Sequence, residues 1–311
     1  MRRENLLNFM PFLFLLVLIF IFTTRSPTFL TASNLYNVVM TSSILLIVSA
    51  GATFIILMGC IDLSVGGIAT VAGILTSLVA PKIGIPALLV GVLFGTICGF
   101  INGIILVRWK IPSFLVTLGM MTMLHGMALF ITGGLATPIR NETYNWLANG
   151  RMLGKFPNVG LWSLVIYGTL LYINFQTRFG RCMYAIGGDE KVSQLSGLPV
   201  DKYKILAFTF SGMLAGLTGA LLAARLGSGT PELGMYLMFE SITAIVIGGT
   251  AITGGIGGLH RTILGVLVIT ILSNGMNIIA LHPYTQTIIK GCVILIAVGS
   301  MLERRKIGLI K

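Results

Sequence analysis

The feature that most constrains this chain is the repetition of long apolar segments along nearly its whole length. A helix needs about 20 mostly apolar residues to cross the hydrocarbon core of a bilayer. The pattern predicts an all-α membrane protein with about ten transmembrane helices in one transmembrane domain, residues 1–311. Ten segments approach the required length, at residues 7–23, 38–58, 64–80, 86–107, 112–132, 157–175, 205–224, 238–254, 261–280 and 285–302.

Composition supports a chain that is surrounded by lipid. The 311 residues are 55% hydrophobic and 10% charged, whereas a soluble domain carries about 25% charged residues. The net charge of +12 does not indicate nucleic-acid binding, because the basic residues lie at the ends of apolar runs. Four cysteines lack CxxC spacing, so we expect buried small hydrophobes and neither a metal site nor disulfides: Cys60, Cys98, Cys182 and Cys292.

The distribution of basic residues predicts the orientation. With a cytoplasmic N-terminus, fourteen of the 21 Lys and Arg residues fall on the inner side, and the other seven fall outside or within a span. Since inner loops are enriched in Lys and Arg, both termini are expected to be cytoplasmic. No small-x-small cleavage site follows the first apolar run, so we expect it to be a retained helix and not a signal peptide.

Two extramembrane segments follow from this orientation. The outer segment, about residues 133–156, is polar and suits a lid or a docking surface. The inner segment, about residues 176–204, is the longest charged stretch. Within it, Asp189 is placed to cap a short helix, and Gly197 is placed to end that helix before Pro199. We expect a helix across the membrane face, with an ordinary solvated loop as the alternative.

No common catalytic pattern is present. The sequence lacks HExxH, GxSxG and the phosphate-binding GxxxxGK[ST], so the chain cannot hydrolyse ATP by P-loop chemistry. An ion-coupled carrier usually keeps several ionisable groups within its spans. Here the candidates are Asp62, His125 and Glu240. We therefore expect a transporter subunit that is not an enzyme, that holds no cofactor or metal, and that draws energy from a partner ATPase.

Polar residues at membrane depth are candidates for a solute pathway or gate. Asp62 and Ser64 either order a break that lines the pathway or cap the helix that follows. Other amides and hydroxyls either bind an uncharged polar solute or tie helices together, which is the commoner use. This group contains Asn102, Thr117, Thr122, Asn274 and Asn277. His125 is expected to bond a neighbouring helix.

A glycine-rich run lies near the predicted cytoplasmic end of the eighth span. Residues 248–258 contain six glycines among eleven residues, which would cost several kcal/mol, relative to Ala, in an unbroken helix (about 1 kcal/mol each). The run predicts a helix break or a very close helix approach. Gly248 and Gly249 are candidate gate residues, and tight packing is the alternative.

Weak internal symmetry is also visible. Asp62 and Ser64 precede the third span, while Glu240 and Ser241 lie at the start of the eighth. These two spans are predicted to run in opposite directions, as an inverted repeat requires. A possible inverted repeat is therefore expected, with chance placement as the alternative.

Five stretches together resemble the ribose/arabinose/xylose-type permeases of bacterial ABC importers. Residues 59–66 are similar to the family segment GGIDLSVG, with Cys60 in place of the second Gly. The other stretches, in family order, are residues 111–119, 177–188, 246–250 and 254–257. The resemblance implies a permease subunit in the cell inner membrane that pairs with a second copy or a paralogue. It also implies a cytoplasmic ATPase that binds ATP and an extracytoplasmic binding protein that delivers a monosaccharide.

The resemblance further implies that the inner segment docks into a groove of the ATPase. The matching residues are Arg178, Phe179, Gly180, Arg181, Gly187, Gly188, Asp189 and Gly197, with Asp189 standing where the family typically has Asn. Alternatives are a permease of the same family for a nucleoside, a branched-chain amino acid or a furanosyl signal, and an ion-coupled secondary carrier.

Overall fold

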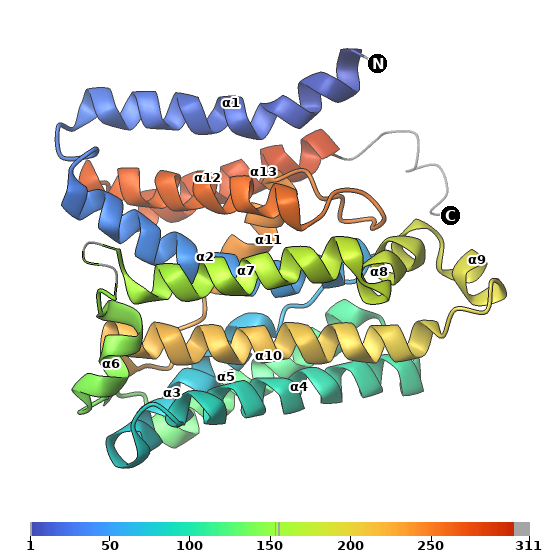
Figure 1. The fold of residues 1–311 in the computed structure, drawn as a ribbon, viewed down its shortest axis with the longest axis horizontal. Helices are drawn as coiled ribbons and strands as arrows, with labels where there is room; N and C mark the ends of the chain where they lie inside the picture. Colours follow the sequence, from blue (N-terminus) through green and yellow to red (C-terminus); the bar gives the residue numbers. More distant parts are fainter. Residues whose placement is uncertain (1, 153, 155, 302–311) are drawn as a thin grey trace.

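Helices make up almost all of the regular structure in the computed structural model, which describes residues 2–152, 154 and 156–301. The elongated apolar helices lie side by side in Figure 1. They are α1 (Arg2–Arg25), α2 (Ala32–Leu57), α3 (Val65–Ile83), α4 (Ala87–Trp109), α5 (Ser113–Thr132), α7 (Asn158–Gln176), α10 (Val200–Leu226), α11 (Leu237–Ile247), α12 (Leu259–Ile278) and α13 (Pro283–Met301).

Short elements connect these helices. They are α6 (Glu142–Asn149), α8 (Arg178–Gly188) and α9 (Glu190–Leu195), together with the two-residue strands β1 (Thr137–Pro138) and β2 (Ser228–Gly229). The strands pair antiparallel. In Figure 1, α6 lies at one end of the bundle and α8 and α9 lie at the opposite end, where α1 begins. These are called the α6 end and the α8 end below.

The expected all-α membrane fold is confirmed. Within the part of the chain that the structure describes, seven helices are long and apolar enough to cross a membrane. They are α2, α3, α4, α5, α7, α10 and α12. Residues 10–25 of α1 and residues 235–247 around α11 form shorter apolar helices.

The helix bounds differ from the sequence expectations at several places. α2 begins at Ala32, earlier than residue 38, because Thr31 caps it by accepting a hydrogen bond from the Asn34 N–H. The eighth span ends at Ile247, well before residue 254, because the glycines that follow break the helix. α8 was not anticipated as a helix. Residue 302 and the basic tail, residues 303–311, lie outside the described residues, as does Lys155.

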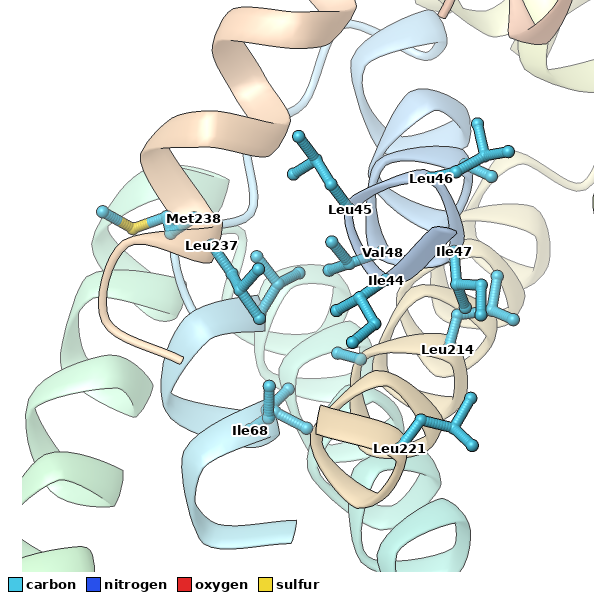
Figure 2. Close-up of a cluster of buried hydrophobic side chains, with 14 of the residues drawn as sticks. Ile44, Leu45, Leu46, Ile47, Val48, Ile68, Leu214, Leu221, Leu237 and Met238 are labelled. Carbon is cyan, nitrogen blue, oxygen red and sulfur yellow. The ribbon is translucent and has the colours of Figure 1, made fainter. Parts of the chain in front are cut away.

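α2 forms the centre of the core. Figure 2 shows its consecutive side chains from Ile44 to Val48 pointing in different directions toward neighbouring helices. They pack in one buried cluster with Ile68 of α3, Leu214 of α10 and Leu237 of α11. A helix that is apolar all round is buried on all sides, and α2 is buried in this way from Ser43 to Leu57.

Glycines bring α4 and α10 into backbone contact. A Cβ atom built on Gly95 would strike the Gly212 carbonyl oxygen, and one on Gly212 would strike that of Gly95. Further backbone contacts lie along both helices: Gly216 packs against the Gly91 carbonyl, Gly99 against the Phe208 carbonyl, and Gly103 against the Ile205 backbone. Small residues four apart let helix backbones approach closely in a membrane. The two helices are therefore joined with almost no side chains between them.

Two helices begin partway through the bundle. The carboxylate of Asp62, just before α3, accepts a hydrogen bond from Ser211, which lies about 16 Å along α10 from its first residue at 1.5 Å per residue. Gly66, at the start of α3, packs against the Gly234 carbonyl and Met238 at the start of α11. The first turns of α3 and α11 thus meet inside the bundle.

From this meeting point the two helices run in opposite directions. α3 runs to the α6 end, where the amide of Asn141 donates to the Ala80 carbonyl (3.0 Å). α11 runs to the α8 end and leads into the glycine run. The opposed directions that an inverted repeat requires are present in the fold, and non-helical segments, residues 58–64 and 230–236, precede the two helices.

We predict that Gly95→Leu lowers the free energy of unfolding by about 1–3 kcal/mol, the usual cost of overpacking. The new side chain would force α4 and α10 apart. Thermal unfolding in detergent measures the change. Gly168→Leu in α7 is the control, because nothing lies within 4 Å of a Cβ atom there. Equal stability of the two variants would contradict the close packing of α4 and α10.

Candidate functional site

A stretch of extended backbone connects α2 to α3 inside the bundle. The chain leaves α2 at Leu57 and turns at Gly59, whose φ of +76° favours glycine. The N–H groups of Ile61 and Leu63 then donate to the hydroxyls of Ser113 (3.1 Å) and Thr117 (3.0 Å). These two hydroxyls belong to the first turns of α5. They supply the partners that a helix would otherwise provide, as lipid cannot.

Asp62 organises a buried polar cluster at this break. Its Oδ1 atom accepts hydrogen bonds from the Ser64 N–H (2.9 Å) and hydroxyl (2.6 Å), and its Oδ2 atom accepts one from Ser211 (3.3 Å). Asn102 of α4 donates to the Ser64 hydroxyl (2.9 Å). Asp62, Ser64, Asn102 and Ser211 are all at most 3% exposed. The cluster ties the break to α4 and α10.

Asp62 and Ser64 do not cap the first turn of α3 with their side chains, which corrects that alternative. Ser64 is the N-cap residue of α3, but its side chain makes no capping hydrogen bond, because the hydroxyl donates to Asp62. Asp62 bonds the N–H of Ser64 and not those of the first helical turn. The structure shows a break between two helices at Asp62, and the expectation that this break lines a solute pathway stays a prediction.

The glycine run forms the second break at the α8 end. Residues 248–258 contain no regular helix, and Gly249, Gly254, Gly255, Gly257 and Gly258 all have positive φ. The predicted break is therefore confirmed. Thr250 stabilises the loop by accepting from the Gly258 N–H (3.0 Å). Gly248 packs against the Arg261 carbonyl at the start of α12, so close packing accompanies the break.

The two breaks meet α8 at a backbone junction, which we define as Leu57, Gly187, Gly254 and Gly255. The Leu57 carbonyl accepts a hydrogen bond from the Gly255 N–H (2.8 Å). Gly187 of α8 lies against both groups, and a Cβ atom there would strike them. Gly254 in turn lies against the backbone of Gly59 and Gly187.

A second contact fastens α8 to the glycine run. The hydroxyl of Tyr184 donates to the Gly257 carbonyl (3.1 Å) and receives a hydrogen bond from Asn174 of α7 (3.2 Å). α8 is therefore in direct contact with both breaks.

Within the inner segment, the predicted capping is confirmed. Asp189 caps α9 by accepting from the Val192 N–H (3.0 Å), and Gly197, with φ +79°, follows the helix. Phe179 packs between Phe54 of α2 and Phe210 of α10, with ring centroids 5.4 and 6.1 Å away.

The remaining residues of the inner segment divide by exposure. Gly180 packs on the Asn174 backbone. Arg178, Arg181, Gly188 and Asp189 are exposed. The segment thus has an anchored side, through Phe179, Gly180 and Gly187, and a free side.

Several of the other polar candidates join helices, as the commoner use predicts. Asn274 of α12 exchanges two hydrogen bonds with Asn34 of α2 (3.0 and 2.8 Å). Asn277 accepts from Gln286 of α13 (2.8 Å). Thr122 bonds a carbonyl of its own helix. His125 is exposed, and no bond from it to a neighbouring helix is recorded among the described residues.

Cys60, Cys98 and Cys182 are buried as expected, whereas Cys292 of α13 is exposed, which corrects that expectation. Within the described residues, no group of His, Cys, Asp and Glu side chains is arranged to hold a metal ion.

Sequence reasoning missed an ion pair between two apolar helices. Lys290 of α13 donates to Glu240 of α11 with an Nζ–Oε1 distance of 2.6 Å. The residues are 50 positions apart. The sequence signal was one acidic residue in the eighth predicted span and one basic residue in the tenth, which does not by itself specify a contact.

A hollow of about 490 Å³ lies beside the segment that leads into α11. It is lined by α5 and the segment before α11, and its polar lining residues are His125, Thr230 and Glu232.

A bundle of long apolar helices with two breaks in contact is the architecture of a membrane-spanning protein. Comparison with known proteins gives the family. Residues 34–298 match the model of the branched-chain amino acid transport system permease component, and the chain belongs to this family of permeases.

Curated relatives align over most of their length. The chain is 36% identical to ribose import permease protein RbsC of Escherichia coli K12, over 91% of this chain and 90% of that protein. It is 37% identical to RbsC of Bacillus subtilis (95% and 92% covered). It is 32% identical to the L-arabinose ABC transporter permease protein AraH of Azospirillum brasilense (91% and 85%). No solved structure matches the chain.

We predict that Asp62→Asn is tolerated and Asp62→Leu is not. Asn keeps an acceptor oxygen for Ser64, and its amide can donate to Ser211 in place of accepting. Leu leaves the N–H and hydroxyl donors of Ser64 and the hydroxyl donor of Ser211 without an acceptor, at about 1–3 kcal/mol for each. Thermal unfolding in detergent compares the variants. A Leu variant as stable as the Asn variant would show that the Asp62 cluster does not hold the break.

Proposed function

We propose that this chain is the permease subunit of an ATP-driven importer for a monosaccharide. The observation that carries the proposal is the similarity, over about nine-tenths of the chain, to permeases named for ribose and arabinose import. The backbone junction supports it, because the junction connects an exposed charged segment directly to two helix breaks. ATP is bound by a partner subunit.

In the proposed arrangement, the ten apolar helices lie in the inner membrane of a bacterium, and α3 and α11 each complete a span with the non-helical segment that precedes them. The α8 end faces the cytoplasm together with both termini, and the α6 end faces outward. The support is the excess of basic residues in the loops at the α8 end. The α6 end would then receive the loaded extracytoplasmic binding protein, and a second copy or a paralogue would complete the channel.

The free side of the inner segment is suited to docking on the ATPase. Val192 and Leu195 of α9 are 57% and 88% exposed, although they lie on a short polar helix outside the apolar bundle. Arg178 and Arg181 are exposed on α8. Exposed apolar side chains flanked by charges are typical of a protein interface. We assign the free side, with Gly188 and Asp189, as the ATPase contact.

The anchored side transmits the movement. When the ATPase moves α8, Gly187 and Tyr184 push on the Leu57 carbonyl and on the glycine run. We assign Gly248 and Gly249 as the hinge of this gate, since positive φ at Gly249 requires the freedom of glycine. We assign Asp62, Ser64, Asn102 and Thr117 to holding the first break as it moves, and Asn274 to holding α12 against α2. Small shifts in packed, bistable elements produce such switches.

Reconstituted transport tests the proposed function. In proteoliposomes with the partner ATPase and binding protein, uptake of radiolabelled ribose or arabinose should require ATP. Leucine supplied with the same components is the control for solute class. Uptake driven by a pH or sodium gradient without ATP would instead establish a secondary carrier.

We predict that Gly188→Trp and the double variant Arg178→Glu/Arg181→Glu lose the ATPase in a pull-down, with unchanged thermal stability. A Cβ atom at Gly188 meets nothing within 4 Å, so Trp alters the surface and not the packing. Gly187→Trp is the contrasting variant. It should lower thermal stability as well, because Gly187 lies on the backbone junction. Normal co-purification of Gly188→Trp and of the charge-reversed variant would contradict the assigned ATPase contact.

A further inference from the structure

The ion pair of Glu240 and Lys290 lies at membrane depth. Glu240 is in the first turn of α11, which begins inside the bundle beside Gly66. Lys290 is seven residues after Pro283, the start of α13, and so lies about 10 Å along that helix. Both positions are within the hydrocarbon layer in the proposed arrangement. Charged side chains are costly there, and they usually face the bundle interior or a water-filled cavity.

The pair is not in the bundle interior. The Lys290 and Glu240 side chains are 27% and 21% exposed, although the described exterior of the bundle is otherwise dominated by apolar side chains. Gln286 and Thr287 precede Lys290 by four and three residues, so the three lie on one face of α13. A polar stripe around a partly exposed ion pair indicates that this face meets water and not lipid.

The Asp62 cluster lacks this access. Its four members are at most 3% exposed, and the oxygens of Asp62 already accept from Ser64 and Ser211. Glu240 and Lys290 have each other as partners and still present accessible surface. A passing solute can contact them without breaking a buried network.

We propose that Glu240 and Lys290 form a contact site for an uncharged polyhydroxylated solute midway through the membrane. This inference rests on the proposed function and adds the residues that the solute touches. A sugar hydroxyl can donate to the carboxylate and accept from the ammonium group. Because the two charges neutralise each other, the site suits a neutral solute better than an ion. Hydrogen bonds to charged groups are stronger than neutral ones.

The test combines thiol labelling with protection by the solute. In a Cys292→Ser background, Lys290→Cys and Thr287→Cys should react with a membrane-impermeant thiol reagent, and ribose or arabinose delivered by the binding protein should slow the reaction. Thr287→Cys keeps the ion pair and covers the case in which Lys290→Cys does not fold. The control is the protein without these substitutions, in which Cys292 is present. Cys292 is exposed but lies about 200° around α13 from Lys290, and we expect it to face lipid and stay unlabelled.

Uptake gives a second readout. The double variant Glu240→Gln/Lys290→Met removes both charges with little change in volume, and the rate of sugar uptake should fall about tenfold, as expected for losing a hydrogen bond to a charged group. Unlabelled cysteines at 287 and 290, labelling that the sugar leaves unchanged, or full uptake by the double variant would overturn the inference. If the unmodified protein shows no ATP-dependent sugar uptake, the proposed function fails, while labelling still reports whether the face is wet.

Discussion

The structure depends on satisfying backbone hydrogen bonds where helices are broken inside an apolar bundle. A freed N–H or C=O group costs several kcal/mol in hydrocarbon (about 2–7 for a buried amide). Here the partners are protein groups. At the first break the Ser113 and Thr117 hydroxyls accept hydrogen bonds from backbone N–H groups, and at the second break the Gly255 N–H donates to the Leu57 carbonyl. This requirement explains why hydroxyl residues begin α5 and why the two breaks lie in contact. Neither break can form independently of its neighbours.

The same contacts place the moving parts of the proposed importer next to one another. α8 touches both breaks through Gly187 and Tyr184, while its exposed side is left to a partner. Tight junctions of backbone against backbone transmit displacement well, since there are few side-chain rotamers to absorb it. In this arrangement the charged segment and the interior breaks form one mechanical unit, although they are distant in sequence.

Local patterns were predictable from the sequence, and long-range contacts were not. The apolar spans follow from segment length, the cap of α9 follows from Asp189, and the second break follows from the glycines at 248–258. The start of α3 and of α11 inside the bundle could not be predicted, because an apolar run has the same sequence pattern whether it begins at the membrane surface or within the bundle. The ion pair of Glu240 with Lys290 and the junction at Gly187 depend on which helices are neighbours. A single sequence does not encode that information in any local pattern.

The close contact of α4 with α10 has a consequence for how the two ends of the molecule communicate. α10 has 27 residues and so extends about 40 Å. Near one end it is bonded to α9 through Lys204 and Glu190 (2.6 Å). Toward the other end, the carbonyls of Ala220 and Ala224 accept hydrogen bonds from Tyr144 and Asn149 of α6. In the proposed arrangement, α10 is stiffened along its side by α4 and acts as a rod between the two membrane surfaces. A binding protein arriving at α6 and a nucleotide-driven pull at α9 would then tilt the same rigid body, so each surface of the membrane can sense events at the other.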